Sequence, residues 1–238
     1  EEAAAQGLVA GINVAMRIKN REPFILDRSL CYIGVLIDDL TTKGTQEPYR
    51  MFTSRVEYRL ILREDNADLR LNKIGYEAGL IQKAEYLKVQ EKARAIQEGI
   101  SFLKATRLKP QADLPVKKIT TLEEYLRRPE VSIEDIKNLN GGDLDIPEIA
   151  LKQVEIEVKY SGFIQRQARE VEKFKNLEKI KLPERLDYSV VNGLSREIKE
   201  KLNKFKPINL GQASRISGIT PAAISILMVY LRKLNGQK

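Results

Sequence analysis

The 238-residue sequence contains no histidine, no tryptophan and a single cysteine, Cys31. Without histidine, the chain cannot form a Ser-His-Asp or Cys-His nucleophile pair, a histidine proton shuttle or a histidine-containing zinc site. One cysteine can form neither an internal disulfide nor a CxxC centre, which fits a reducing compartment. We therefore expect no metal site, and we expect any acid-base work by this chain to depend on carboxylates, tyrosines or arginines.

Long apolar runs are also absent. The longest one, residues 224–231 with Ser225 inside it, is far shorter than the roughly 20 residues that a membrane span needs. The opening residues, EEAAAQGLVAGIN, lack the basic region of a signal peptide and have the composition of a helix interior. These features predict a cytoplasmic protein and a chain that begins inside a longer one.

Basic side chains are concentrated in the last third of the sequence. Residues 1–162 carry 25 basic and 26 acidic side chains, whereas residues 163–238 carry 16 basic and 7 acidic ones. The excess of positive charge in residues 163–238 produces an electrostatic field that attracts polyanions such as RNA. A solvated, lysine-rich helical surface would have the same composition. Few aromatic side chains in this segment could stack on bases, so recognition of phosphates and shape is the more natural mode.

Helix signals mark residues 2–17 and the chain from about residue 72 onward. Residues 2–17 are predicted to form a helix in which Gly7 and Gly11 share a face, so that a backbone or a ligand can approach closely. Gly79 is a plausible C-terminal cap of the helix that begins near residue 72. Residues 82–106 form a long amphipathic pattern.

Capping residues and breaks divide the rest of the chain into further helices. Thr121 and Ser132 each begin a capping box, and residues 146–177 indicate one long helix in which Gly162 marks either a kink or a close contact. In the tail, Ser195, Asn209 and Thr220 are predicted N-terminal caps, and Pro221 follows the last of them at the first helical position. The fold class is therefore mainly α, with any sheet confined to the first third.

Residues 55–63, RVEYRLILR, are ambiguous. Val56, Tyr58 and two leucines alternate as in a half-buried strand, whereas Ser54 with Glu57 forms a capping box that would start a helix. The capping box favours the helix, and the strand remains open. In either case a spacing of four places the arginines at 55, 59 and 63 on one side.

Few motifs in the sequence carry chemistry of their own. Neither GxGxxG nor GxxxxGKS occurs, so the chain has no self-contained nucleotide site. The adjacent carboxylates Asp38-Asp39 and Glu123-Glu124 diverge on a helix, which favours solvated faces over acid-base chemistry. No catalytic residue can be assigned.

The segment from Gly44 to Leu71 is rich in arginine. No glutamate stands four residues before the arginines at 55, 59 and 63, and guanidiniums without local partners suit an anionic ligand such as a phosphate or a polycarboxylate. The structural alternative is that Asp65, Asp68 and distant carboxylates satisfy them. The candidate anion-binding residues are Arg50, Arg55, Arg59 and Arg63.

Three strings carry a resemblance to a known family: QGLVAGIN near the start, EPYRMFTSRVEYRLILREDNADLRL, and LGQASRISGITPAAIS in the tail. Together they resemble the flavin-binding subunit of the bacterial tRNA uridine 5-carboxymethylaminomethyl modification enzyme, the MnmG (GidA) family. The resemblance extends from end to end and implies a helical C-terminal region with a short remnant of an α/β flavin-binding domain. It implies three parts, with the end of the FAD-binding domain and the arginine-rich block at 1–75, a helical subdomain at 76–162 and a basic helical subdomain at 163–238.

The same resemblance implies cofactors for the longer protein. The first helix would be the last one of the flavin domain, with its N-terminal end approaching the isoalloxazine ring, where backbone N–H groups can stabilise negative charge on a reduced flavin. The cofactor-adjacent candidates are Gln6, Gly7, Gly11 and Asn13, and the structural alternative is a small-residue helix that packs tightly on a sheet. NADH and methylenetetrahydrofolate would be co-substrates. Cys31, where the family often has alanine, is expected to be a core residue rather than a catalytic one.

As implied by the family, the whole enzyme modifies carbon five of the wobble uridine together with a partner GTPase of the MnmE type, and it forms a homodimer. In that scheme the helical tail docks tRNA and the GTPase, and the fragment alone does not turn over. The alternatives are a non-catalytic RNA-binding or protein-docking helical module and, less well supported, a DNA-binding regulator. Residues 212–227 resemble a helix-turn-helix, but the second helix, PAAISILMVYL, is apolar on most sides and is expected to be buried.

Overall fold

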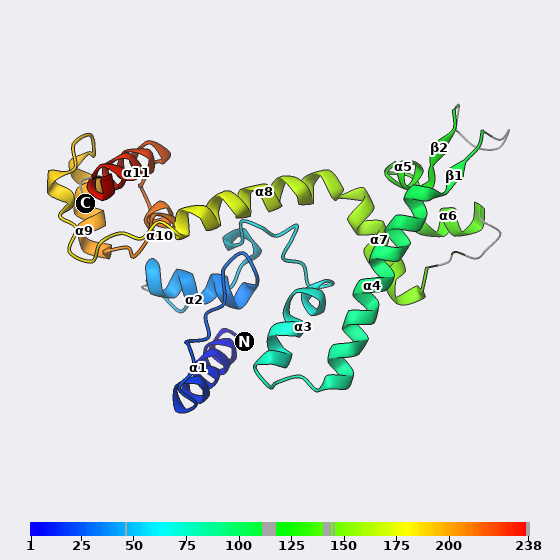
Figure 1. Ribbon diagram of the computed structural model, residues 1–238, viewed down its shortest axis with the longest axis horizontal. Coiled ribbons are helices and arrows are strands. Elements are labelled where there is room, and N and C mark those ends of the chain that lie inside the picture. Colours follow the sequence, from blue (N-terminus) through cyan, green and yellow to red (C-terminus); the bar gives the residue numbers. More distant parts are fainter. Residues whose placement is uncertain (46, 111–117, 140–143, 145, 237–238) are drawn as a thin grey trace. The chain divides into compact units, whose positions relative to one another are not determined.

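The structure, a computed structural model, describes residues 1–45, 47–110, 118–139, 144 and 146–236. The described residues form eleven α-helices, two 3₁₀ helices and one two-stranded sheet (Figure 1), which confirms the mainly α fold class. The chain divides into two compact units, one made of Glu1–Tyr58 with Ala168–Lys238 and the other of Arg59–Gln167. We describe each unit by itself. The three-part division at 1–75, 76–162 and 163–238 stays a prediction.

The unit Arg59–Gln167 is built around its longest helix. Its helices are α3 (Ala67–Glu77), α4 (Lys83–Ala105), α5 (Leu122–Leu126), α6 (Ile133–Leu139) and α7 (Glu148–Lys159). The strands β1 (Arg107–Leu108) and β2 (Thr120–Thr121) pair antiparallel, with Arg107 opposite Thr121. The expectation that any sheet is confined to the first third of the chain is therefore wrong. The core consists of buried aliphatic side chains from α4, α5, α6 and α7, among them Leu103, Leu126, Ile136 and Val154. Helix α4 therefore supplies the surface on which the shorter helices pack.

Local capping chemistry begins and ends these helices as the sequence predicts. The Thr121 side chain accepts from the Glu124 N–H while the Glu124 carboxylate accepts from the Thr121 N–H, and Ser132 and Asp135 make the same reciprocal pair. Gly79 follows α3 with φ +81°, and the N–H of the next residue donates to the carbonyl of residue 75. The predicted cap at Gly79 is thus a left-handed glycine closing a Schellman motif.

The predicted single helix over residues 146–177 is wrong. The structure has two helices, α7 and α8 (Ser161–Glu178), separated at Tyr160, whose backbone (φ −100°, ψ 8°) departs from helical geometry. A methyl group added at Gly162 would meet no atom within 4 Å, so this glycine is not a site of close contact. The apolar periodicity continues through the break, and the sequence pattern therefore does not reveal it.

Residues 55–63 form neither of the two predicted elements. A short 3₁₀ helix, Thr53–Arg55, is followed by consecutive turns that continue to α3. The buried side chains Val56, Tyr58 and Leu62 account for the alternation that suggested a strand. The helix that the capping box favoured is wrong here because burial of these side chains outweighs a local capping signal.

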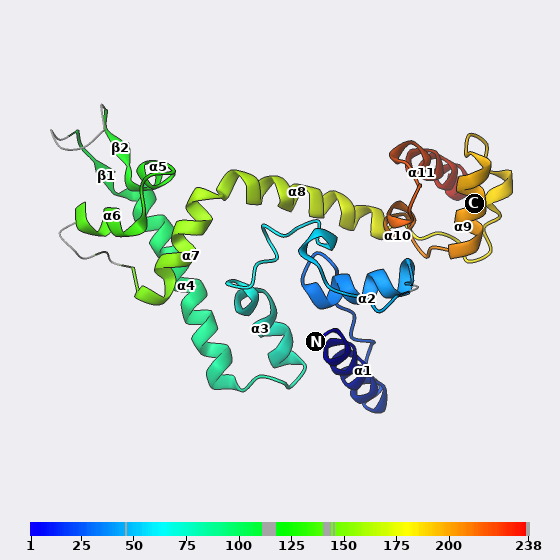
Figure 2. The ribbon, with the colours of Figure 1, turned by 180° about the vertical axis from the view of Figure 1, so that it is seen from behind.

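The unit Glu1–Tyr58 with Ala168–Lys238 contains two groups of helices. The N-terminal group consists of α1 (Glu2–Ile18) and α2 (Tyr32–Thr42). The C-terminal group, which we call the bundle, comprises residues 180–234 with α9 (Arg196–Phe205), α10 (Leu210–Arg215) and α11 (Pro221–Gly236), seen from behind in Figure 2. Ser195, Asn209 and Thr220 each accept a backbone N–H at the start of these helices, which confirms the three predicted caps.

Helix α9 ends on a strained residue. Lys206 has φ +44° and ψ +60°, a left-handed conformation that glycine adopts without steric cost. We expect Lys206→Gly to raise the free energy of unfolding by about 0.5–1 kcal/mol. Urea unfolding followed by circular dichroism measures the change, with Lys204→Gly inside α9 as the control that should lower stability. A destabilised Lys206→Gly variant would contradict the prediction.

Candidate functional site

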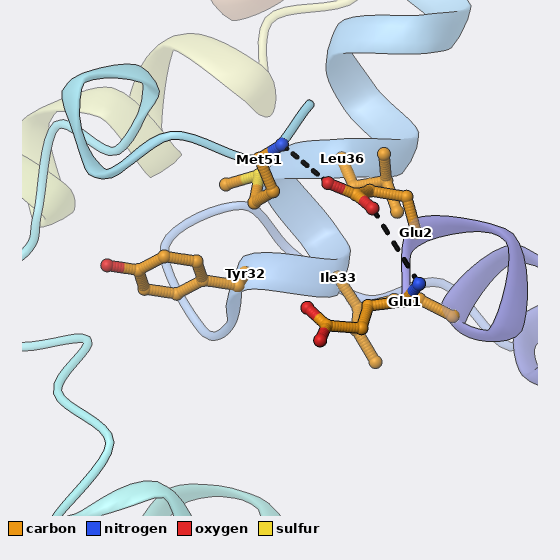
Figure 3. Close-up of a pocket in the computed structure, with 7 residues that line it drawn as sticks. Glu1, Glu2, Tyr32, Ile33, Leu36 and Met51 are labelled. Carbon is orange, nitrogen blue, oxygen red and sulfur yellow. Dashed lines mark hydrogen bonds and ion pairs between the residues drawn. The ribbon is translucent and has the colours of Figure 1, made fainter. Parts of the chain in front are cut away.

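A cavity of about 260 Å³ opens where the N-terminal ends of α1 and α2 meet (Figure 3). Apolar side chains make up most of its wall, and two glutamates stand at the start of α1. The lining residues are Glu1, Glu2, Ala5, Tyr32, Ile33, Leu36 and Met51. The cavity can therefore receive a flat, apolar edge of a ligand, whereas the glutamates disfavour a phosphate.

Two local features hold α2 in the position that forms this wall. The Cys31 sulfur caps the helix by accepting from the Gly34 N–H at 3.3 Å, and the residue is 3% exposed. Gly34 lies against the preceding loop so closely that an added Cβ would be 2.4 Å from the Asp27 carbonyl oxygen. The expectation that Cys31 is a core residue is confirmed, and its capping role is an addition to it.

Glu2 connects α1 to the segment that carries Met51. Its carboxylate accepts from the Met51 N–H at 2.8 Å, and this hydrogen bond lowers the pKa of Glu2 below its ordinary value. The first turn of α1 has no side-chain cap of its own. Because Glu1, Glu2 and Ala5 line the cavity, this uncapped first turn borders it.

The four predicted cofactor-adjacent residues lie on α1, and none of them lines this cavity. Gln6 donates to the Glu2 carbonyl, and added Cβ atoms at Gly7 and Gly11 would meet nothing within 4 Å. Asn13 is fully engaged by the following loop, because its side-chain amide donates to the Phe24 carbonyl and accepts from the Phe24 N–H, both at 2.9 Å. A cofactor role for these residues stays a prediction.

Next to the cavity, α2 carries a buried ionic cluster that the sequence analysis missed. The Arg28 side chain is 2% exposed and bonds to Asp38, to Asp39 at 3.1 Å and to Glu57 at 2.7 Å. Asp39, also 2% exposed, accepts from Tyr49 at 2.9 Å and pairs with Lys43 at 2.8 Å. The cluster therefore fixes α2 to the loops on either side of it.

The electrostatics of this cluster favour a charged Asp39 and a neutral Tyr49. Burial would raise the pKa of Asp39, but hydrogen bonds from Lys43, Tyr49 and Arg28 outweigh it and hold the pKa below its ordinary value. Burial and the Asp39 hydrogen bond raise the pKa of Tyr49 to about 12. The interpretation of Asp38-Asp39 as a solvated face is wrong, because tertiary contacts supply the cations that sequence neighbours do not.

The two residues of the second carboxylate pair, Glu123 and Glu124, differ in exposure. Glu123 is buried and bonds to Arg127 at 2.7 Å, whereas Glu124 is exposed and caps α5. The prediction of a solvated face therefore holds for Glu124 and is wrong for Glu123.

The four candidate anion-binding arginines have different surroundings. Arg50 and Arg59 are exposed, and the Arg55 guanidinium lies 4.5 Å from the centre of the Tyr49 ring. Arg63 is only 16% exposed and bonds to Asp65 at 3.0 Å, to Gln153 at 3.2 Å and to Glu157 at 3.5 Å. The geometry around Arg63 matches the structural alternative, while an anion-binding role for the four arginines stays a prediction.

Helix α8 and the bundle present basic side chains to solvent. Several of them are exposed and have no ion-pair partner among the described residues. These are Arg166, Arg169, Lys173, Lys179, Lys181, Arg185, Lys204, Lys206, Arg232 and Lys233. Unpaired surface cations are available for phosphates without the loss of an existing ion pair.

Helix α11 places its apolar side in the bundle core, as expected from its sequence. Ala223, Ile224, Leu227 and Leu231 are buried against α9 and α10. Its other face, with Ser225, Val229 and Arg232, is exposed, so the expected burial holds for one side of the helix only.

Sequence reasoning predicted the helix at residues 2–17 but neither helix α2 nor the residues that line the cavity. Tyr32, Ile33 and Leu36 lie in a compact apolar segment that looked like ordinary core, and Met51 comes from a loop. One signal in the sequence was available. Arg28 is followed ten and eleven residues later by Asp38 and Asp39, and charged residues are almost never fully buried unless they are paired. Within the described ranges, no group of three acidic or cysteine side chains could hold a metal ion, and no helix has the length and apolar character to cross a membrane.

Comparisons with known proteins match this chain over nearly its whole length. The family profile described as "tRNA modifying enzyme MnmG/GidA C-terminal helical domain" matches residues 83–168, and that of the "C-terminal helical bundle" matches residues 170–238. The fold is thus that of the C-terminal helical domain and helical bundle that these two profiles describe.

Curated relatives and a solved structure agree with the profiles. The tRNA uridine 5-carboxymethylaminomethyl modification enzyme MnmG of Caldicellulosiruptor saccharolyticus is 49% identical, over 98% of this chain and 39% of that enzyme. The MnmG of Geotalea uraniireducens is 48% identical, over 100% of this chain and 40% of that enzyme. Aquifex aeolicus GidA superposes with a TM-score of 0.80 at 46% identity, over 97% of this chain and 37% of that one. The chain belongs to the MnmG/GidA family and spans about two fifths of the length of these relatives.

Proposed function

We propose that this chain is the C-terminal region of a cytoplasmic, flavin-dependent enzyme that modifies carbon five of the wobble uridine of tRNA. The observation that carries the proposal is the match to MnmG enzymes at 48–49% identity over 98% or more of the chain. In this proposal the redox and one-carbon chemistry, with FAD, NADH and methylenetetrahydrofolate, belongs mainly to the part of the enzyme outside this chain. The region described here positions tRNA and borders the flavin.

Support for tRNA docking comes from the charge of the bundle and the state of its cations. Residues 163–238 hold 16 basic and 7 acidic side chains, and ten of the basic ones are exposed and form no ion pair among the described residues. Contacts between such cations and phosphates release counterions, so the affinity falls steeply with salt. A partner GTPase of the MnmE type and homodimerisation are further parts of the proposal, supported by the family membership alone.

The tRNA role is tested by removing four unpaired cations from the full-length enzyme, Lys181, Arg185, Arg232 and Lys233, each replaced by glutamine. Each lost phosphate contact should reduce the slope of log affinity against log salt by about 0.7–0.9, so four lost contacts should reduce it by about 3. Filter binding of tRNA across a salt series measures it. The control removes equal charge from the other unit through glutamine at Lys83, Lys88, Lys104 and Lys109. Equal slopes in both variants would contradict docking by the bundle.

The cavity at α1 and α2 fits the edge of a flavin. Its wall offers Tyr32, Ile33 and Leu36 to an apolar ring, and the uncapped N–H groups of α1 lie beside it. When bound, the flavin would supply the redox chemistry. The chain's own residues would hold one edge of the ring and exclude water from it, while Glu1 and Glu2 direct phosphate groups elsewhere.

Filling the cavity tests this assignment in the full-length enzyme. Ala5→Phe places a ring inside the cavity and should weaken flavin retention about tenfold, since an overpacking cost near 1.4 kcal/mol corresponds to that factor. Ala10→Phe adds the same ring to α1 away from the cavity wall and serves as the control. The flavin absorbance that survives gel filtration is the readout. If the Ala5→Phe variant retains as much flavin as the wild type, the cavity is not part of the flavin site.

A further inference from the structure

Asp38 lies between two arginines that come from distant parts of the sequence. One is Arg28, which is anchored in the buried cluster on α2. The other is Arg215, at the end of α10, which bonds to the second Asp38 oxygen at 2.6 Å. One carboxylate thus bridges the N-terminal group of helices and the bundle within the same unit.

The Arg215 side chain is enclosed on the bundle side as well. It is 8% exposed, bonds to Glu178 at 2.9 Å and lies 4.8 Å from the centre of the Phe174 ring. Both of these partners stand near the C-terminal end of α8. A single guanidinium therefore holds α2, α8 and α10 together.

The bundle has a core that is independent of this junction. Its buried side chains come only from residues 182–231 of the described chain, with Leu202, Leu210 and Leu227 fully enclosed. No residue of α1 or α2 belongs to that core among the described residues. Packing of the bundle on itself does not require the contact with α2.

Charged contacts join the bundle and the end of α8 to the N-terminal group. Besides the Arg215–Asp38 pair, Lys175 lies 3.6 Å from Asp27 in the loop before α2. The Lys175 side chain is 48% exposed, so this second pair is weakened by solvent. The buried Arg215–Asp38 pair is therefore the stronger of the two links.

We propose that Arg215 and Asp38 form an ionic latch that holds the bundle against α2, and that the bundle separates as a folded body when this pair is broken. The latch sets the position of the bundle without contributing to its internal fold. This inference does not depend on the proposed function, because it concerns only how two groups of helices within one unit are attached.

Distance measurements between spin labels test the latch in the full chain. One label is attached at Thr41→Cys on α2 and the other at Ser225→Cys on α11, two exposed positions, while Cys31 is buried and stays unlabelled. With Arg215 and Asp38 intact, the two labels should give one narrow distance distribution. Arg215→Gln and, from the other side, Asp38→Asn should each broaden it and remove the narrow peak.

Two further variants separate the latch from a general loss of structure. Arg196→Gln removes a cation from an exposed ion pair on α9 and should leave the narrow peak intact, and Arg215→Lys should restore part of it. Hydrogen exchange at Leu202 and Leu227 should stay slow in every variant. A narrow distribution in both latch variants would overturn the proposal, and so would loss of slow exchange together with broadening.

Discussion

Replacing Arg28 with alanine is expected to lower the free energy of unfolding by about 3–5 kcal/mol, the usual cost of removing one partner from a buried ionic cluster. Asp39 is 2% exposed, and Asp38 already shares its charge between two arginines. Urea unfolding of the chain at neutral pH measures the loss. The control is Arg196→Ala, whose side chain is 94% exposed and whose removal should change stability very little.

The Arg28→Ala effect should depend on pH in a defined direction. In the folded wild type, the pKa of Asp39 lies below its ordinary value, so the stabilisation is present above the unfolded pKa of about 3.9 and is lost as the pH falls through the folded value. Protonated Asp39 needs no cation. The stability difference between wild type and variant should therefore narrow below about pH 4. A difference that is constant from pH 7 to pH 3 would show that the loss comes from packing rather than charge.

Gly34→Ala is the second large effect, and it acts through sterics alone. The added Cβ would lie 2.4 Å from the Asp27 carbonyl oxygen and 2.8 Å from the Leu26 carbonyl oxygen. These atoms belong to the backbone and cannot turn aside, so α2 must shift away from the loop. We expect a loss of about 1–3 kcal/mol in the free energy of unfolding.

Gly162→Ala provides the matched comparison for Gly34→Ala. This glycine also lies in a helix, but its added Cβ would meet no atom within 4 Å. The substitution should raise stability by about 0.5–1 kcal/mol, because alanine is the better helix former. Chemical unfolding of both variants under one condition checks the opposite signs, and two changes of the same sign would contradict the steric account.

Local signals predicted helix ends well. Thr121, Ser132, Asn209 and Thr220 all cap helices because a side-chain oxygen within three residues of a free N–H needs no distant partner. The break at Tyr160 escaped prediction for the opposite reason, since nothing in the neighbouring residues forbids a continuous helix there.

The candidate site was less predictable than the helices. The small-residue helix α1 was identified, and Ala5 on it does line the cavity, but the rest of the wall comes from α2 and from Met51. The grouping of α1, α2 and that loop depends on contacts such as Glu2 with the Met51 N–H, 49 residues apart. No pattern of local spacing carries that information.

By itself the sequence determined the mainly α class, most helix ends, the basic last third and the resemblance to the MnmG/GidA family. These depend on periodicity, capping and composition, which are local or summed properties. Only the tertiary structure decided which charges are buried. In the folded protein, Arg28 pairs with Asp38 and Asp39, and Arg215 also pairs with Asp38. Arg63 pairs with Asp65 and Glu157. The physical reason is that removing a charge from water requires a partner at hydrogen-bonding distance, and folding brings together partners up to 177 residues apart.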